Sequence, residues 1–399
     1  MRRMPASLFL LILILVALNL RPALSSLAPL LDRITQDLGL STLAAGLLTT
    51  LPVVCLGLFA PLAPRLARRL GVERTLSLAL ITLGIALWLR ASDMALLLYL
   101  CTLLCGGSIG VAGTLLPAIV KREHPERADL FTGVYTMALC LGAALAAGLS
   151  VPLANLLDSW QASLACWALL VVIALPAWRL SMPHPWPEKM TSQQQATPRL
   201  WHLPLARQVT FFMGCQSSLA YIVFGWLPFL LQQRGLSDIE SGWLMAASVM
   251  AQVLTALLAP VIGRMGRDQR PAILLLLSCT AIGLLGLMIG PLSLRWLFAV
   301  LLGFGQGGSF SMALTLLVLR TSDARLAGAL SGMAQGTGYM LAALGPLAVG
   351  ILLEITADLR VIASLFALIL LSAAMLGFQV GRRRRICLRE DGSTEVVDG

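Results

Sequence analysis

Long apolar stretches separated by short polar breaks recur twelve times along the chain. Stretches of about 20 residues are typical of helices that cross a bilayer core of roughly 30 Å. The pattern therefore predicts twelve membrane-spanning helices, six on each side of a polar middle. The predicted spans are residues 7–32, 42–64, 73–91, 94–120, 129–156, 160–180, 208–233, 240–262, 272–292, 295–319, 327–354 and 359–381.

A polar stretch separates the sixth span from the seventh. Residues 181–206 contain five prolines and a run of three glutamines, which is typical of a linker at a membrane surface. The sequence thus predicts an all-α integral membrane protein with a six-helix bundle at 1–180, a linker at 181–206, a second six-helix bundle at 207–382 and a tail at 383–399.

The composition agrees with a membrane protein. Hydrophobic residues make up 58% of the chain and charged residues 12%, whereas soluble domains are roughly 25% charged. The net charge of +10 could indicate a nucleic-acid partner, but the basic residues fall in short clusters between apolar runs rather than on one patch. We therefore expect a lipid bilayer around the chain and no nucleic-acid partner.

The positions of Lys and Arg predict the orientation. Of the 29 basic residues, 23 fall at the N-terminus, in the loops between even and odd spans, in the linker and in the tail. The last, Arg21, lies inside the first span, and the five on the other side are Arg33, Arg90, Arg234, Arg295 and Arg360. The positive-inside rule then places both termini, the linker and the tail in the cytoplasm.

The two halves also repeat each other. Arg65 and Arg264, Lys121 and Arg320, and Gly133 and Gly332 are each 199 residues apart. Several matches in one register indicate a duplication, which predicts two six-helix bundles related by pseudo-symmetry. Parallel six-helix repeats of this kind resemble the plan of the major facilitator superfamily, in which the substrate site lies between the halves.

Arg21 is the strongest candidate for a substrate-binding residue. A guanidinium inside a span costs roughly 2.5–3.5 kcal/mol on insertion scales, and intramembrane ionisable residues usually mark a transport pathway. The alternative is a structural arginine bonded to carbonyls of neighbouring helices. Because the position 199 residues later is Ala220, the arginine is not duplicated, which favours binding over a symmetric structural role.

Further polar and aromatic residues inside the spans are candidates to line the same cavity. Tyr221 and Trp226 could stack on a planar ring, and Gln335 and Tyr339 are four residues apart and share a helical face. For each residue, an interhelical hydrogen bond or simple packing is the alternative, and Trp226 could belong to an interfacial aromatic belt. The candidates are Asn19, Gln216, Ser217, Tyr221, Trp226, Gln306, Ser309, Gln335 and Tyr339.

Two basic loops are candidate gates. The superfamily carries a Gly-x-x-x-Asp-Arg-x-Gly-Arg-Arg signature after its second helix, and residues 61–69 resemble it without the glycines and the Asp. The corresponding loop after the eighth span, Gly263 to Asp268, keeps the Arg-x-Gly-Arg core. Pairing with helix ends at a cytoplasmic gate and plain positive-inside anchoring both fit these arginines. The gating candidates are Arg65, Arg68, Arg264 and Arg267.

Three stretches carry a more specific resemblance. Asn19-Leu-Arg-Pro22, Gly225-Trp-Leu-Pro228 and Ser331-Gly-Met-Ala-Gln-Gly-Thr-Gly-Tyr339 resemble the cyanate and 2-nitroimidazole transporter family of the superfamily. The resemblance implies a monomeric transporter of the bacterial inner membrane that exports a small planar solute by alternating access. It also fits Arg21, because a guanidinium fork matches a nitro or anionic two-oxygen group.

A broad-specificity drug/proton antiporter is the alternative within transport. Proton-coupled transporters usually carry a carboxylate near the membrane midplane, whereas all 19 Asp and Glu residues here fall in predicted loops or at span ends. A membrane enzyme would need a catalytic cluster, and the sequence contains no metalloprotease or nucleophile motif. We expect no enzymatic activity, no metal and no cofactor.

Overall fold

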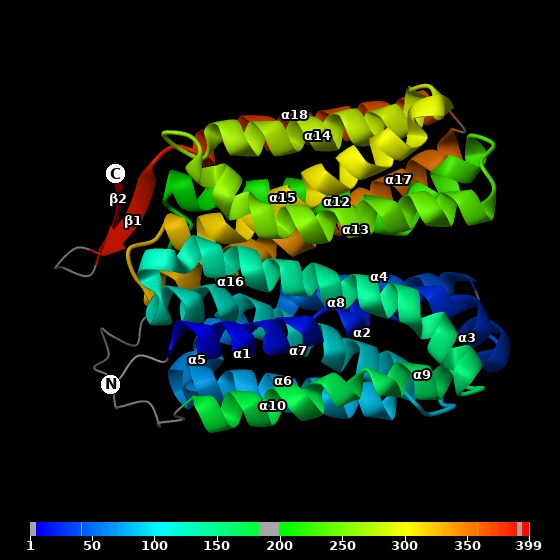
Figure 1. Ribbon diagram of the computed structural model, residues 1–399, viewed down its shortest axis with the longest axis horizontal. Helices are drawn as coiled ribbons and strands as arrows, with labels where there is room; N and C mark the ends of the chain where they lie inside the picture. Colours follow the sequence, from blue (N-terminus) through cyan, green and yellow to red (C-terminus); the bar gives the residue numbers. More distant parts are fainter. Residues whose placement is uncertain (1–4, 41, 183–198, 357, 389–392, 399) are drawn as a thin grey trace. The chain divides into compact units, whose positions relative to one another are not determined.

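The computed structural model describes residues 5–40, 42–182, 199–356, 358–388 and 393–398. Most of the predicted linker, residues 183–198, lies outside the described residues. The described part is almost entirely helical (Figure 1). Its helices in the first half are α1 Ala6–Asn19, α2 Pro22–Ser25, α3 Leu31–Leu38, α4 Thr42–Phe59, α5 Leu62–Leu70, α6 Val72–Leu89, α7 Ala95–Glu123, α8 Ala128–Leu156, α9 Trp160–Cys166 and α10 Ala168–Ser181.

The second half has the same character and ends in a short β-hairpin. Its helices are α12 Pro204–Gln233, α13 Asp238–Arg264, α14 Arg270–Ile289, α15 Arg295–Leu319, α16 Ala324–Ala342, α17 Leu344–Ile355 and α18 Leu359–Val380. Strands β1 (Arg384–Leu388) and β2 (Thr394–Asp398) pair antiparallel. The sequence pattern predicted only a basic tail here, so the hairpin is an addition to the all-α fold.

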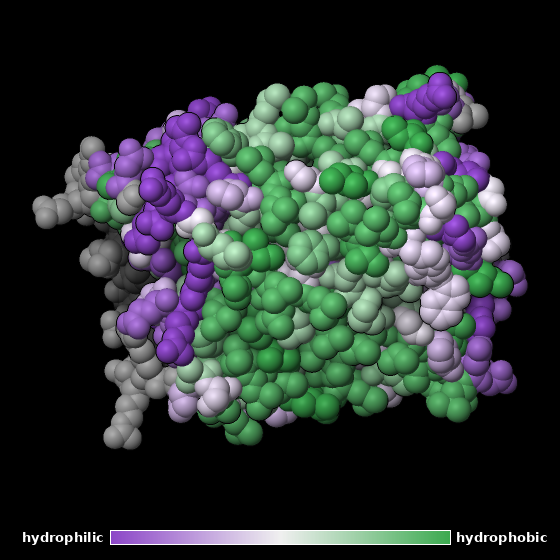
Figure 2. Space-filling view, turned by 45° about the horizontal axis from the view of Figure 1, so that its top comes forward, coloured by the Kyte–Doolittle hydropathy of each residue, from purple (hydrophilic) through white to green (hydrophobic). Residues whose placement is uncertain are grey.

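The lengths and composition of the helices match the predicted spans. Eleven segments of the described residues are long and apolar enough to cross a membrane, and a twelfth results if the bent pair of Thr50–Phe59 and Leu62–Leu70 is one span. Hydrophobic side chains cover the middle of the exposed helices, and hydrophilic ones gather near the helix ends (Figure 2). The chain is thus a multi-pass membrane protein.

The first span is not the continuous helix that the apolar run predicts. It breaks between α1 and α2, at Leu20 and Arg21, and continues through a 3₁₀ turn at Ala28–Leu30. Pro22 causes the break, because proline has no N–H to give to the carbonyl four residues earlier, that of Leu18. Gly142 of α8 approaches that same carbonyl, and a Cβ at this glycine would lie 2.6 Å from the oxygen. The structure therefore places Arg21 at an opening of the helix backbone.

The chain divides into two compact units. Unit 1 comprises Met1–Glu126, Ala138–Pro198 and Ala324–Gly336, and unit 2 comprises Arg127–Met137, Arg199–Asp323 and Thr337–Gly399. The start of α8 therefore packs with the second-half helices in unit 2, and the first part of α16 packs with first-half helices in unit 1. The predicted bundle boundaries at the linker stay a prediction.

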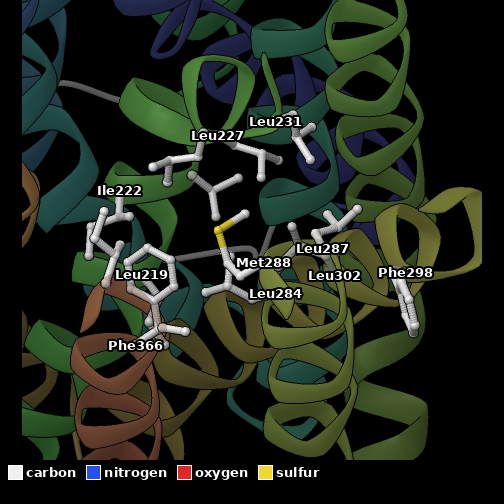
Figure 3. Packing of buried hydrophobic residues seen from close by; sticks show 14 of the residues in the cluster. Leu219, Ile222, Leu227, Leu231, Leu284, Leu287, Met288, Phe298, Leu302 and Phe366 are labelled. Atoms are coloured by element: carbon white, nitrogen blue, oxygen red, sulfur yellow. The ribbon is translucent and has the colours of Figure 1, made fainter. Parts of the chain in front are cut away.

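Unit 2 is held together by a large apolar core and by close helix contacts. The core joins α12, α14, α15 and α18 (Figure 3); its buried residues include Leu219, Ile222, Leu227, Leu231, Leu284, Leu287, Met288, Leu302 and Phe366. Gly303 and Gly307 of α15 let the backbone of α13 approach at Ser248 and Gln252. Small residues at this spacing are typical of close helix packing in membranes.

Unit 1 uses the same device between α4 and α7. A Cβ at Gly106 would lie 2.9 Å from the carbonyl oxygen of Pro52, and one at Gly110 would lie 2.8 Å from that of Leu56. The two halves therefore share a glycine-dependent contact between equivalent helix pairs, which agrees with the internal repeat.

Candidate functional site

Arg21 lies at the N-cap of the short helix α2, with φ −110° and ψ −29°. Its side chain is partly exposed, unlike most polar residues inside the spans. Helix α1 ends at Asn19 and α2 begins at Pro22, so Arg21 lies in the break between two helices rather than in a regular helical turn. This is an arrangement seen where membrane transporters bind solutes, since an interrupted helix exposes polar backbone groups.

Asn19 contacts the backbone of its own unit. Its Nδ2 donates to the carbonyls of Leu15 at 2.7 Å and of Leu170 in α10 at 3.3 Å. The side chain is buried, and its Oδ1 has no hydrogen-bond partner among the described residues. Asn19 thus links α1 to α10, and its Oδ1 lies beside the break as an acceptor that could bind a solute donor.

Arg90 holds the segment that follows Arg21, a role that the sequence did not indicate. The pattern placed Arg90 among the outer-loop arginines, but its side chain is fully buried at the end of α6. It donates to the carbonyl of Ala23 at 2.7 Å and to the hydroxyl of Thr102 at 3.0 Å. The sequence could not distinguish Arg90 from a surface arginine, because the Ala23 carbonyl that it binds is distant in sequence.

Two of the aromatic candidates meet in unit 2. The rings of Tyr221 and Tyr339 lie edge to face with centroids 6.3 Å apart. Trp226 instead donates from its indole N–H to the carbonyl of Pro346 at 3.0 Å and packs on Phe229. It therefore fastens α12 to α17, which is the packing alternative stated above.

The candidate glutamines of unit 2, Gln216 and Gln306, form hydrogen bonds with neighbouring protein groups. Gln306 donates to the Leu219 carbonyl at 3.2 Å and lies 3.5 Å from Gln252, so it joins α15 to α12 and α13. Gln216 donates to the neighbouring Ser217 hydroxyl at 2.7 Å. Both glutamines are buried. Nothing in the residue pattern of α13 distinguishes Gln252, so the sequence did not indicate this contact.

Gln335 and Tyr339 share a helical face but belong to different units. Gln335 is buried in unit 1, where it donates to the Gly113 carbonyl at 3.3 Å and to the Ser331 hydroxyl at 2.7 Å. Tyr339 belongs to unit 2. The boundary between the two units therefore falls between these two residues of α16.

Of the four gating candidates, Arg264 has a specific acidic partner. Its guanidinium forms a two-pronged ion pair with Asp129 at the start of α8, with Nη2 to Oδ1 at 2.6 Å. Gly133, one turn further along α8, packs directly on Pro260 of α13. Asp129 was not among the predicted site residues, because a first-turn acid is also an ordinary helix-end residue.

Arg65, the counterpart of Arg264 in the first half, has no acidic partner equivalent to Asp129. The residue 199 positions after Asp129 is Gly328, so the partner of Arg264 is not repeated for Arg65. Arg65 and Arg267 are exposed, and Arg68 lies near the like charges of Arg65, Arg69 and Arg325. In unit 1 only the close packing is repeated: a Cβ at Gly332, 199 residues after Gly133, would lie 3.0 Å from the ring of Pro64.

No group of three or more His, Cys, Asp or Glu side chains comes together within the described ranges. These ranges therefore offer no candidate metal centre.

Comparison with known proteins agrees with this architecture. The model of the Major Facilitator Superfamily matches residues 8–346. An uncharacterised transporter of Bacillus subtilis is 37% identical over 94% of this chain and 93% of its own, and the 2-nitroimidazole transporter of Escherichia coli is 36% identical over 94% and 95%. The cyanate transport protein of Escherichia coli is 32% identical over 88% of this chain and 91% of its own.

The fold agrees with solved transporters as well. The structure of a proton:xylose symporter superposes with a TM-score of 0.75 over 94% of each chain, at 13% identity. At this low identity the similarity concerns the fold alone, whereas the family match and the closer relatives also concern the class of activity. The chain belongs to the Major Facilitator Superfamily and is a transporter of small solutes.

Proposed function

We propose that the protein moves a small planar solute with a nitro or anionic group across the bacterial inner membrane, in the direction of export. The observation that carries the proposal is Arg21 at the break between α1 and α2. A guanidinium presents parallel donors to a two-oxygen group, and nitro groups and small anions match that geometry. The 2-nitroimidazole and cyanate transporters among the relatives support the same solute class.

We further propose that both termini are cytoplasmic and that the chain works as a monomer. The distribution of Lys and Arg supports the orientation. The direction of export is an expectation from the family resemblance of residues 19–22, 225–228 and 331–339. A drug/proton antiporter remains the alternative, but the described Asp and Glu residues lie in loops, in the C-terminal hairpin or near helix ends, and Glu73 and Asp129 are paired with arginines. These positions do not support proton coupling through a buried acid, which the antiporter alternative would need.

A binding panel tests the solute class. We expect purified protein to bind 2-nitroimidazole or cyanate in isothermal titration calorimetry and not to bind xylose, a neutral, non-planar solute. Xylose is the matched comparison because a structural neighbour with the same fold transports it. Binding of xylose without either planar solute would contradict the proposal and leave the fold assignment intact.

We propose that the Asp129–Arg264 pair acts as a latch at the cytoplasmic end of α8 and α13. The pair joins the first turn of one helix to the last turn of the other. Gly133 and Pro260 extend the same contact by close packing. A latch must be weak enough to open in each transport cycle, and a partly exposed ion pair is worth only about 0.2–1 kcal/mol.

Replacing Asp129 by Asn is expected to loosen this latch. Hydrogen exchange of the amides at 128–137 should become up to about five-fold faster, the factor that corresponds to losing such a pair. The exchanged pair, Asp129→Arg with Arg264→Asp, should restore protection. As a control, Glu240→Gln breaks the pair with Arg295 at the opposite end of α13 and should leave these amides unchanged. Unchanged exchange in Asp129→Asn would contradict the latch.

A further inference from the structure

The C-terminal hairpin is docked on unit 2 rather than trailing from it. Ile386 of β1 donates its N–H to the Arg320 carbonyl at 2.8 Å, and its own carbonyl accepts from the Ser322 N–H at 3.0 Å. The Ile386 side chain is fully buried. The hairpin lies beside the ends of α14 and α18 (Figure 1). This docking fixes the run of arginines from Arg382 to Arg385 at the end of α18.

Two guanidinium groups flank one exposed aromatic ring at this corner. The Arg270 guanidinium carbon lies 4.9 Å from the centre of the Phe378 ring, and that of Arg382 lies 6.0 Å from it. Phe378 is 41% exposed in the last turn of α18. Guanidinium groups at these distances are attracted by the ring face and held in place by it.

An exposed apolar stripe leads to this ring. Leu368, Leu371, Met375 and Phe378 are spaced by three or four residues along α18, so they share one face. All four are exposed in unit 2. In a membrane-spanning helix, such a face is solvated by acyl chains, and the stripe ends directly at the two guanidinium groups.

The positive charge at this corner exceeds the negative charge that faces it. Arg270 pairs with Asp268 at 2.7 Å, and β2 places Asp398 opposite Arg384 and Glu395 opposite Cys387. Arg382, Arg383 and Arg385 are exposed. Burial, together with the like charges of the tail arginines, lowers the pKa of Arg320 to about 10. The corner therefore gathers cations at short range, which favours an anionic ligand.

We propose that this corner binds the headgroup of an anionic phospholipid. The phosphodiester lies between Arg270 and Arg382, and one acyl chain follows the stripe from Phe378 to Leu368. Basic groups beside membrane-spanning helices are suited to such headgroups. The adjoining apolar stripe favours a lipid over free phosphate, and the docked hairpin distinguishes the corner from a mobile basic tail. The proposal does not depend on which solute is transported.

Native mass spectrometry of the full-length protein tests the proposal. Phosphatidylglycerol or phosphatidylcholine is titrated into the detergent-solubilised chain, and the apparent Kd of each is measured. We expect phosphatidylglycerol to bind more tightly and Arg382→Gln to weaken it about five-fold, the share of one basic residue at an anionic surface. Arg383→Gln is the matched control, since it removes the same charge from the next position, and its effect should be clearly smaller.

A second variant guards against a general charge effect. Phe378→Leu keeps the apolar stripe and removes the ring, and it should weaken phosphatidylglycerol binding about two- to five-fold. Equal losses in Arg382→Gln and Arg383→Gln would overturn the proposed site, as would equal affinity of the wild type for both lipids. Displacement of the lipid by inorganic phosphate at the same concentration would overturn the choice of a lipid as the ligand.

Discussion

Replacing Arg21 by alanine is expected to abolish solute binding while the protein still folds. The variant removes both prongs of the guanidinium fork, and hydrogen bonds to charged groups contribute roughly 1.5–3 kcal/mol each. Loss of two such bonds predicts an affinity at least about 100-fold lower. Calorimetric titration of 2-nitroimidazole and cyanate against wild type and variant measures this directly. Arg21 is partly exposed at a helix break, so its removal should leave the apolar packing intact.

Two further variants make the Arg21 result specific. Arg21→Lys keeps the charge and loses the fork, so we expect it to bind weakly rather than normally. Arg33→Ala removes an exposed arginine of the nearby helix α3, whose guanidinium donates to Asn155 at 2.6 Å, and should bind like the wild type. If Arg21→Ala is monodisperse and binds with unchanged affinity, Arg21 is a structural residue and the solute site lies elsewhere.

Replacing Gly303 by alanine is expected to cause the largest loss of stability. A Cβ at this position would overlap the carbonyl of Ser248, so α15 and α13 would have to separate. Overpacking in a well-packed core typically costs about 1–3 kcal/mol, and a clash with a helix backbone leaves no side chain to move aside. We expect little monodisperse protein and a clearly lower unfolding temperature in a fluorescence-based thermal assay.

Gly148→Ala is the matched control for this experiment. Gly148 also lies inside a long helix, α8, but a Cβ there would meet nothing within 4 Å. Alanine is favoured over glycine in a helix interior by about 1 kcal/mol, so this variant should be as stable as the wild type or more stable. Equal stability of the two variants would contradict the close α13–α15 contact.

The sequence predicted the spans well because their signal is local. A run of about 20 apolar residues identifies a membrane helix without knowledge of its neighbours. The break of the first span was not predicted, although its cause is local: Pro22 cannot supply the N–H that the Leu18 carbonyl needs. By contrast, the hairpin of the tail depends on pairing with Arg320 and Ser322, which are more than 60 residues away in sequence.

The candidate site was less predictable, because its interactions join distant segments. Residue type and position did not distinguish Arg90 from an outer-loop anchor, yet its contacts with Ala23 and Thr102 bury it completely. The sequence likewise did not distinguish Asp129 from an ordinary acid at the start of a helix, because its pairing with Arg264 joins distant segments. Trp226 shows the converse, since a residue suited to stacking on a solute donates instead to the Pro346 carbonyl.

Counterflow in proteoliposomes is the most direct test of the central claim, because it requires neither the energy source nor the direction of transport to be known. Vesicles containing the purified protein are loaded with unlabelled 2-nitroimidazole or cyanate and diluted into the labelled solute. We expect transient accumulation of label for at least one of these solutes with the wild type and none with Arg21→Ala. Absence of counterflow for both solutes, with folded and correctly inserted protein, would contradict the proposed solute class.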